Sequence, residues 1–364
     1  MGEDLVYWVW LSQCFSYGSG KIGKILELSG DAKALYQNGE EGRRALSIFS
    51  EQDLRRMSKT SLERAELILE QCRDEGIRVI SYADPEYPKR LREIYGPPAV
   101  LYVKGSLAGL ENQLVLTVVG TREAVGYTRG ITGSLCCQLA RAGVVIVSGC
   151  AVGIDEYAHR GALKAGKRTI AVLGCGLDVN YPSQNRELKE KILLSGGALV
   201  SELPPGTKPD GKYFPTRNRL LAGLGMGVLV THAPERSGSL ITADCGLDQN
   251  KEVFAVPGMI TDKHCQGCHG LIKQGAKLVE NVDDILTEFS EFTGFSRKFP
   301  KHSAKSLAKA EKRVYDMLSL KPKYIDEILS ASQDSYEEVI QALFQLEAKG
   351  YIKQIHQNLY IKKM

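Results

Sequence analysis

The sequence predicts an α/β protein in which a mostly parallel sheet carries helices on both faces. Beyond residue 78, short apolar runs rich in valine and isoleucine alternate with amphipathic helical stretches, the pattern of strands buried on both sides. Several of these runs end in a turn of small residues that opens a helix, as expected where strands and helices alternate. The expected strands are residues 114–119, 144–147, 169–173, 199–200, 228–230 and 253–256.

The chain, of 364 residues, divides into four expected segments. Residues 1–75 are typical of a small helical domain of the helix-hairpin-helix or SAM-like kind, and residues 76–289 hold the Rossmann-like sheet. A basic linker is expected at 290–308, because residues 290–313 carry seven Lys or Arg against two Asp or Glu. Residues 309–364 predict three helices and a hairpin, the order of a winged helix. Ser335, Glu338 and Gly350 mark the start and the end of its third helix.

The composition is that of an ordinary globular protein, with 43% hydrophobic and 25% charged residues. The net charge of +4 permits an anionic partner without requiring one. No apolar run reaches the ~18 residues of a membrane span, and Glu3 and Asp4 stand where a signal peptide carries basic residues. The nine cysteines follow no disulfide framework. We therefore expect a cytoplasmic protein with no membrane partner.

Small-residue turns follow the expected strands at four places. They are residues 120–122 (GTR), 148–155 (SGCAVGID), 174–176 (GCG) and 237–242 (SGSLIT). Ligands of open α/β sheets lie beyond the carboxyl ends of the strands, where N–H groups at helix starts bind phosphates. Tight turns also need glycine for backbone reasons alone. Four such turns with Ser, Thr and Arg among the glycines nevertheless favour a phosphate-binding crevice.

Residues 212–219 (KYFPTRNR) combine cations with aromatic side chains. Aromatic rings stack on bases and cations neutralise phosphates, which is the combination used to bind single-stranded nucleic acid. The alternative is a helix start with Phe214 in the core and the arginines as solvated caps. If the helix begins at Pro215, Arg217 and Arg219 cannot share one face, so at least one of them could be structural.

Two motif matches lack the context that their chemistry needs. Residues 18–24 (GSGKIGK) nearly spell a phosphate-binding loop, but no strand precedes them and Ile25 replaces the required Ser or Thr. Cys265, Cys268 and His269 spell a haem-attachment signal, and His264 adds a further zinc-type ligand. So tight a run cannot wrap one tetrahedral ion. We expect neither haem, nor a structural metal, nor another cofactor.

Catalytic constellations are not apparent in the sequence, which therefore does not predict an enzyme. No paired acids, nucleophile elbow or Ser-His-Asp spacing stands out. Asp155 and His159 lie four residues apart on one expected helix. Their simplest role is a hydrogen-bonded pair that fixes the start of this helix.

The stretch from residue 82 to residue 279 resembles the DprA/Smf (DNA-processing protein A) family. Residues 84–105 resemble its lead-in segment. Its signature blocks recur in order at 120–122, 148–155, 214–224, 237–242, 253–258 and 267–276. The resemblance implies a Rossmann-like domain, a homodimer, and binding of incoming single-stranded DNA during natural transformation. It also implies that the protein transfers this DNA to the RecA recombinase. In doing so it would relieve the block that single-strand-binding protein imposes on RecA.

The resemblance also implies a set of DNA-binding residues. The chain departs from the family pattern beside them, with His232 in place of Glu and His269 in place of Asn. If these histidines line the crevice, DNA affinity should rise between about pH 7.5 and pH 6. Further departures are Val125, Thr128, Gly225, Asn250 and Lys251. The implied DNA-binding residues are Arg122, Ser148, Gly149, Lys212, Phe214, Arg217, Asn218, Ser237, Gly238, Ser239 and Lys273.

Two other functions are weighed against this interpretation. Nucleotide hydrolases of the phosphoribohydrolase kind use glycine-rich turns on a similar sheet, but their Pro-Gly-Gly-x-Gly-Thr signature is absent here. A double-stranded DNA regulator would act through the winged helix. Its expected third helix, residues 335–349, carries Glu337, Glu338 and Glu347 against the single Lys349, a poor charge pattern for a major groove.

Overall fold

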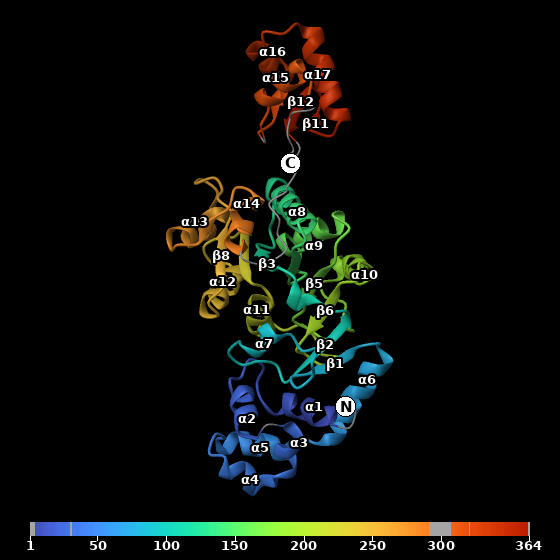
Figure 1. The fold of residues 1–364 in the computed structure, drawn as a ribbon, viewed down its shortest axis with the longest axis vertical. Coiled ribbons are helices and arrows are strands. Elements are labelled where there is room, and N and C mark those ends of the chain that lie inside the picture. Colours follow the sequence, from blue (N-terminus) through green and yellow to red (C-terminus); the bar gives the residue numbers. More distant parts are fainter. Residues whose placement is uncertain (1–3, 30, 291–306, 320, 363–364) are drawn as a thin grey trace. The chain divides into compact units, whose positions relative to one another are not determined.

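The described part of the chain folds into two compact units. In the computed structural model the described residues are 4–29, 31–290, 307–319 and 321–362. The division between the units lies near residue 295 (Figure 1). The boundary expected near residue 75 falls inside the first unit, where helices give way to the sheet.

A nine-stranded sheet forms the centre of the first unit, in the order β1-β2-β6-β5-β4-β3-β7-β8-β9. All neighbours from β6 to β9 in this row are parallel, whereas β2 is antiparallel to both β6 and β1. The chain runs outward from β3 to one side first and later to the other, so the strand order reverses beside β3. Open α/β sheets bind ligands at such a point. The strands are β1 (Arg78–Ser81), β2 (Val100–Gly105), β3 (Val115–Gly120), β4 (Val145–Ser148), β5 (Thr169–Val172), β6 (Ala198–Ser201), β7 (Gly227–His232), β8 (Glu252–Ala255) and β9 (Lys277–Leu278).

Helices cover both faces of this sheet, as Figure 1 shows. The helices α8, α9 and α10 follow β3, β4 and β5 and pack beside one another, while α11 packs against α12 and α7 on the opposite face. The helix α13 packs against β7 and β8. The bounds are α7 (Lys89–Arg92), α8 (Gly126–Arg141), α9 (Ile154–Lys164), α10 (Arg186–Leu194), α11 (Tyr213–Leu224), α12 (Gly238–Asp248), α13 (Gln266–Lys273) and α14 (Val282–Leu286).

One face of the central strand β3 packs against α11, because side chains two residues apart along a strand point to the same face. Val115 and Val119 belong to the same buried cluster as Leu220 of α11. Between them, the Thr117 hydroxyl donates a hydrogen bond to the carbonyl of Leu221, at 2.5 Å. The C-terminal half of α11 is therefore positioned by a strand whose first five residues are all buried.

The helices that precede the sheet share a hydrophobic core with it. Trp8 and Trp10 lie in one buried cluster with Tyr102 of β2 and Leu199 of β6. Trp10 also donates a hydrogen bond from its indole N–H to the carbonyl of Thr60, at 2.9 Å. Shared burial of this kind binds the helices to the edge of the sheet. They are α1 (Leu5–Cys14), α2 (Lys21–Ser29), α3 (Ala32–Gln37), α4 (Gly39–Ala45), α5 (Glu51–Lys59) and α6 (Leu62–Asp74).

The second unit has a small core of its own around Val314, Ile328 and Leu343. The predicted capping box of its third helix is confirmed. The Ser335 hydroxyl accepts a hydrogen bond from the Glu338 N–H at 3.3 Å, and the Glu338 carboxylate accepts one from the Ser335 N–H at 2.9 Å. The element order is that of a winged helix, an assignment that stays a prediction. The elements are α15 (Lys309–Met317), β10 (Lys323–Tyr324), α16 (Ile325–Ala331), α17 (Tyr336–Ala348), β11 (Ile352–His356) and β12 (Leu359–Lys362), with strand order β10-β12-β11.

The expected strands are all present, as β3 to β8, within two residues at each end. The sequence did not predict β1, β2 or β9, which are edge or near-edge strands. Most of the expected linker at 290–308 lies outside the described residues. Within the described residues, no helix has the length and apolar character needed to cross a membrane.

The packing of the first unit continues to its last turn, where the Phe289 ring lies 6.0 Å from the ring of Phe254 in β8. We therefore predict that a chain ending after Ser290 folds by itself. Calorimetry should give one cooperative transition for it, within about 2 °C of the first-unit transition of the full chain. A chain ending after Leu286, which lacks Phe289, should melt at a lower temperature. A broad, non-cooperative transition of the longer fragment would contradict the prediction.

Candidate nucleic-acid interface

A shallow pocket opens where three parallel strands end. Its volume is about 60 Å³, and it lies beyond the carboxyl ends of β3, β4 and β5, beside the start of α11. This is the edge at which the sequence predicts a phosphate-binding crevice. We call it the strand-end pocket. Its lining residues are Arg122, Gly149, Ala151, Val152, Leu173, Gly174, Cys175, Tyr181, Pro182, Phe214 and Arg217.

A cation and two aromatic rings meet at the mouth of this pocket. The guanidinium carbon of Arg122 lies 5.3 Å from the centroid of the Phe214 ring. The Tyr181 ring lies 5.8 Å from the Phe214 ring, tilted by 41°. Arg122 is exposed, and both rings are half-buried. Such a surface can stack a planar base and neutralise a phosphate next to it.

Two of the predicted glycine turns leave room for these side chains. A Cβ atom at Gly174 would lie 2.9 Å from the Phe214 ring. One at Gly149 would meet the guanidinium of Arg217 and lie 2.6 Å from a carboxylate oxygen of Asp155. Glycine is therefore required here by close side-chain approach, in addition to any role of its N–H group.

Arg217 lies beneath the pocket and is 9% exposed. Its Nη1 atom donates hydrogen bonds to the carbonyl of Gly149, at 3.0 Å, and to the carbonyl of Val172. Its Nε atom has no hydrogen-bond partner within the described part of the chain. The guanidinium thus joins the ends of β4 and β5 to α11, and its buried Nε–H group stays without a partner among the described residues.

Asp155 and His159 do not form the pair that the sequence suggested, so that expectation is wrong. The His159 ring hydrogen-bonds to the Thr169 hydroxyl at 2.8 Å. The Asp155 carboxylate instead accepts a hydrogen bond from the N–H of Ala151, at 3.4 Å. Burial raises the pKa of Asp155, and the charge of Arg217 opposes this rise. Asp155 therefore stabilises the buried Arg217 guanidinium, because the two opposite charges compensate each other.

The helix α11 begins at Tyr213, two residues before the expected start at Pro215. Proline is tolerated in the first turn of a helix because the N–H that it lacks would have no partner there. Both arginines of this helix are buried. Arg219 forms an ion pair with Glu202, which follows β6. Arg217 and Arg219 therefore serve different sides of the helix, as the spacing predicted, and both have structural partners.

Lys212 and Lys273, the two lysines among the predicted DNA-binding residues, are both exposed, but they lie at different positions relative to the strand-end pocket. Lys212 stands at the N-cap of α11, where its ammonium lies 5.0 Å from the Tyr213 ring and 3.1 Å from an Asp210 carboxylate oxygen. Lys273 ends α13 and does not line the strand-end pocket. Lys212 therefore extends the cationic surface at the start of α11, whereas the role of Lys273 stays a prediction.

The predicted hydroxyl donors already make hydrogen bonds within the protein. The Ser148 hydroxyl is buried and donates to the carbonyl of Val118, at 2.6 Å. The hydroxyls of Ser237 and Ser239 lie 2.7 Å apart at the start of α12. The Asn218 amide donates to the carbonyl of Gly238 at 3.1 Å, which joins α11 to α12. These side chains shape the turns, and their backbone N–H groups stay the predicted phosphate donors.

The condition on which the expected rise of DNA affinity at lower pH depends is not met by His232 and His269. His232 is 1% exposed and neither histidine lines the strand-end pocket. Burial lowers the pKa of His232 below its ordinary value of 6.5, although Asp262 opposes this effect. His232 is therefore harder to protonate than an ordinary histidine. The His269 ring lies 3.1 Å from the carbonyl oxygen of Gly258.

Several residues of the interface were missed in the sequence. The Tyr181 ring is tilted against the Phe214 ring although the two residues are 33 positions apart, and the partly buried Glu202 pairs with Arg219. The only local signal for Tyr181 is an aromatic residue before Pro182, shortly after the Gly174 turn. Nothing local marks Glu202, because its role depends on contact with a helix that follows it in the chain.

Comparison with known proteins identifies the family. Residues 78–290 match the family model described as DNA recombination-mediator protein A. The chain belongs to this family. The DNA processing protein DprA of Bacillus subtilis is 42% identical over 224 residues, which cover 62% of this chain and 75% of that relative. The DprA/Smf resemblance found in the sequence is therefore confirmed.

Solved structures of relatives share the fold. DNA processing protein A from Streptococcus pneumoniae is 35% identical, with a TM-score of 0.66, over 77% of this chain and 95% of that chain. DNA processing protein A from Helicobacter pylori, described for its single-stranded DNA binding mode, is 29% identical, with a TM-score of 0.53. That match covers 59% of this chain and 96% of the other. The expected sheet with helices on both faces is thus confirmed for the family member in hand.

The crowding at Gly149 gives a test of the glycine requirement. Gly149→Ala should lower the free energy of unfolding by about 1–3 kcal/mol, because the added Cβ atom displaces the Arg217 guanidinium or Asp155. Gly130→Ala is the matched control, since a Cβ atom there meets nothing within 4 Å on the exposed face of α8. It should stabilise the helix by up to about 1 kcal/mol. Urea denaturation measures both, and equal stability of the two variants would contradict the assignment.

The buried His159 predicts a loss of stability in acid. Burial lowers the pKa of His159 from 6.5 to about 3. The unfolded chain therefore binds a proton below about pH 6.5 that the folded chain refuses, so stability falls as the pH falls. Between about pH 7 and pH 5.5 the parent should lose about 1 kcal/mol more than His159→Gln, which has no titrating ring. Urea denaturation at the two pH values measures this difference. Equal losses of unfolding free energy in the parent and in His159→Gln would contradict the prediction.

Proposed function

We propose that this chain binds single-stranded DNA at the strand-end pocket and its rim. The observation that carries the proposal is the placement of the exposed Arg122 guanidinium 5.3 Å over the half-buried Phe214 ring, at the carboxyl end of a parallel sheet. Stacking on an aromatic ring requires an unpaired base, because bases in a duplex are stacked on one another. The pocket therefore favours single strands over duplex DNA.

The residues divide between direct contacts and support. Arg122 and Lys212 would neutralise phosphates, and Phe214 would stack a base, with the tilted Tyr181 ring beside it. Arg217 would hold the pocket in shape through its hydrogen bonds to the carbonyls of Gly149 and Val172. The turn residues Ser148, Gly149, Ser237, Gly238 and Ser239, together with Asn218, would orient backbone N–H groups. The relative from Helicobacter pylori, described by its single-stranded DNA binding mode, supports the substrate class.

Beyond DNA binding, we propose that the chain acts as a mediator and not as a catalyst. It would protect incoming single strands in the cytoplasm, load the RecA recombinase on them and relieve the block by single-strand-binding protein. The family description, DNA recombination-mediator protein A, supports this role. The carboxylate beneath the pocket, Asp155, is buried against Arg217, which suits support better than proton transfer to a substrate.

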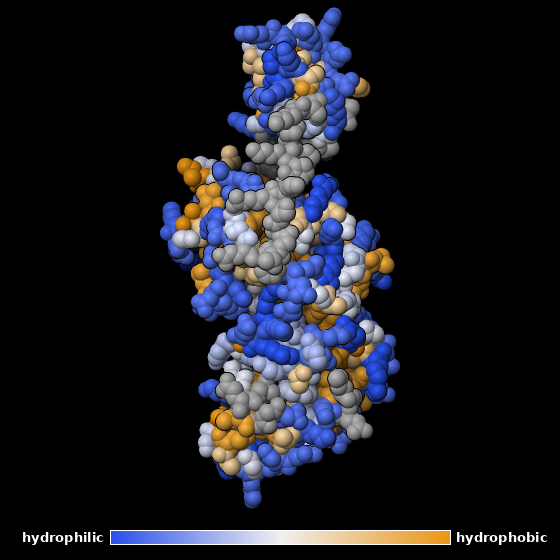
Figure 2. Space-filling view, viewed as in Figure 1, coloured by the Kyte–Doolittle hydropathy of each residue, from blue (hydrophilic) through white to orange (hydrophobic). Residues whose placement is uncertain are grey.

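The homodimer is also part of the proposal. Figure 2 shows hydrophobic residues gathered near α13 on the displayed face of the first unit. Met259 and Ile260, in the loop before α13, are 73% and 87% exposed. Contact with a second copy would remove such side chains from water. A dimer would also present two strand-end pockets to one DNA strand and so increase its affinity.

Two variants separate the contribution of charge from that of stacking. Arg122→Ala should weaken binding of an oligonucleotide and flatten the dependence of log K on log salt by about 0.7, because one phosphate contact is lost. Phe214→Ala should weaken binding by about 1–3 kcal/mol with nearly unchanged salt dependence, because stacking releases few ions. Fluorescence anisotropy with single-stranded oligonucleotides at several salt concentrations measures both quantities.

The matched control is Arg186→Ala, which removes an exposed cation that pairs with Glu190 on α10. It should leave affinity and salt dependence unchanged. Melting curves establish that all variants are folded. If folded Arg122→Ala and Phe214→Ala bind single strands as tightly as the parent, the DNA site lies elsewhere on the protein.

A further inference from the structure

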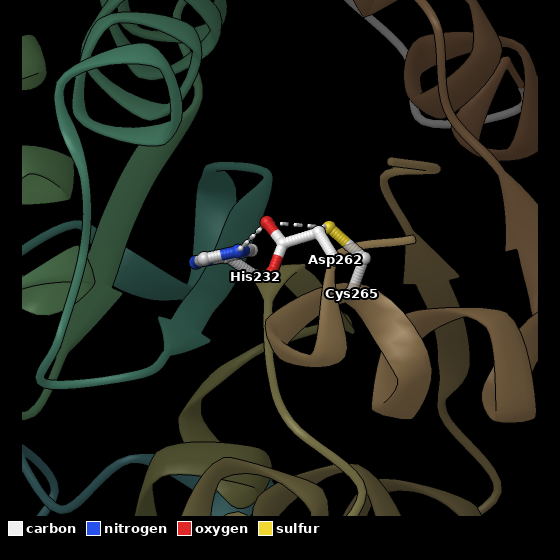
Figure 3. A group of neighbouring side chains, drawn as sticks. All are labelled: His232, Asp262 and Cys265. Atoms are coloured by element: carbon white, nitrogen blue, oxygen red, sulfur yellow. Dashed lines mark hydrogen bonds and ion pairs between the residues drawn. The ribbon is translucent and has the colours of Figure 1, made fainter. Parts of the chain in front are cut away.

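Three side chains of metal-ligand type converge beside the end of β7, as Figure 3 shows. His232 is the last residue of β7, Asp262 precedes the short helix η3 (Lys263–Cys265), and Cys265 ends it. The Asp262 Oδ2 atom lies 3.5 Å from His232 Nε2 and 3.6 Å from Cys265 Sγ. The three ligand atoms all lie within 4.8 Å of one another. None of the three has a role in the proposed DNA site.

The imidazole of His232 points into this cluster without a hydrogen-bond partner. The residue is 1% exposed, and neither ring nitrogen is hydrogen-bonded to any described residue. Its Nε2 atom has the Asp262 carboxylate at 3.5 Å, beyond the length of a good hydrogen bond. Buried polar groups in native proteins nearly always have a partner. The unpartnered His232 ring therefore indicates that a bound ligand supplies this partner.

We propose that His232, Asp262 and Cys265 bind one zinc-type divalent cation, with a fourth position for water or for His264. Imidazole nitrogen, carboxylate oxygen and thiolate sulfur are together the ligand set of Zn²⁺. With metal–ligand bonds of about 2.0–2.3 Å, tetrahedral ligands lie about 3.3–3.8 Å apart. Two of the three separations already match this range. His264 lies next to the open edge, with its Nδ1 atom 3.3 Å from Asp262 Oδ1.

The charges around the cluster suit such an ion. The Asp262 carboxylate lies 3.5 Å from the buried His232 ring at the end of β7, and a divalent cation would compensate its negative charge there. The Cys265 thiol would bind as a thiolate, and its proton would pass to solvent as the sulfur–metal bond forms.

This site differs from the run of Cys265, Cys268 and His269 that the sequence excluded as a metal site. The Cys268 thiol is buried and lies 3.7 Å from the carbonyl oxygen of Val230. The His269 ring is occupied by the backbone of Gly258. His232 lies 30 positions or more before the other two proposed ligands in the sequence. Only the return of the chain from β8 to the end of β7 brings them together.

A bound ion would stabilise the turn that carries Arg122. The carbonyl of His232 accepts a hydrogen bond from the N–H of Thr121, at 2.7 Å. On the same side, His264 Nε2 lies 3.5 Å from a Glu123 carboxylate oxygen. Fixing His232 and the segment 262–265 to one cation would therefore restrict residues 121–123 from two directions. The metal site itself does not depend on whether that turn binds DNA.

The test uses Co²⁺ as a spectroscopic substitute for Zn²⁺ on the full chain, treated with a chelator and kept reduced. We expect one equivalent of Co²⁺ per chain, with a thiolate-to-cobalt charge-transfer band, and displacement of Co²⁺ by Zn²⁺. Cys265→Ser should abolish the band. His232→Ala and Asp262→Asn should raise the Kd more than about tenfold. The melting temperature of the parent should rise with Zn²⁺ and fall back with chelator.

The matched control is Cys268→Ser, which alters a buried thiol three residues away and should leave stoichiometry and band unchanged. Asp262 is about one-third exposed, so Asp262→Asn tests the site even where His232→Ala fails to fold. Absence of a one-to-one complex with the parent would overturn the proposal. A band that survives Cys265→Ser, or one that Cys268→Ser removes equally, would overturn it as well.

Discussion

The first unit depends on the buried guanidinium of Arg217. It donates to backbone carbonyls at the ends of β4 and β5, and Asp155 compensates its charge. A charge is stable inside a protein only where donors and an opposite charge replace water, so this geometry admits little displacement. Because Phe214 stands one helical turn earlier on α11, the same anchor fixes its ring against Gly174 and beneath Arg122.

The opposite side of α11 is fixed to the N-terminal helices. Arg219 pairs with the partly buried Glu202, and Gly18 lies against the Arg219 side chain. Tyr213, at the start of α11, has the Tyr17 ring 5.9 Å from its own. The helix that carries Phe214, Arg217 and Asn218 is thus held between the sheet and the helices that precede it. A change in either neighbour would alter the pocket even without touching its lining.

The turn after β3 links the two sites inferred on this protein. Arg122 projects from it towards Phe214, while the preceding Thr121 is hydrogen-bonded to the end of β7 at His232. Since the strand order reverses beside β3, one short turn contacts side chains from both halves of the sheet. A cation bound at the proposed cluster would therefore act on the turn that carries Arg122 through this backbone contact.

The sequence by itself determined the parallel sheet, because strands buried on both faces leave continuous apolar runs and their turns leave glycines. It also determined the family, and the resemblance implied that Arg122, Gly149, Phe214 and Arg217 serve one site, where the structure brings them together around one pocket. Only the tertiary structure decided that Arg217 supports the pocket from below, that His159 pairs with Thr169, and that His232 joins Asp262 and Cys265. Burial and partners across distant segments depend on how helices pack on the sheet, which no local spacing encodes.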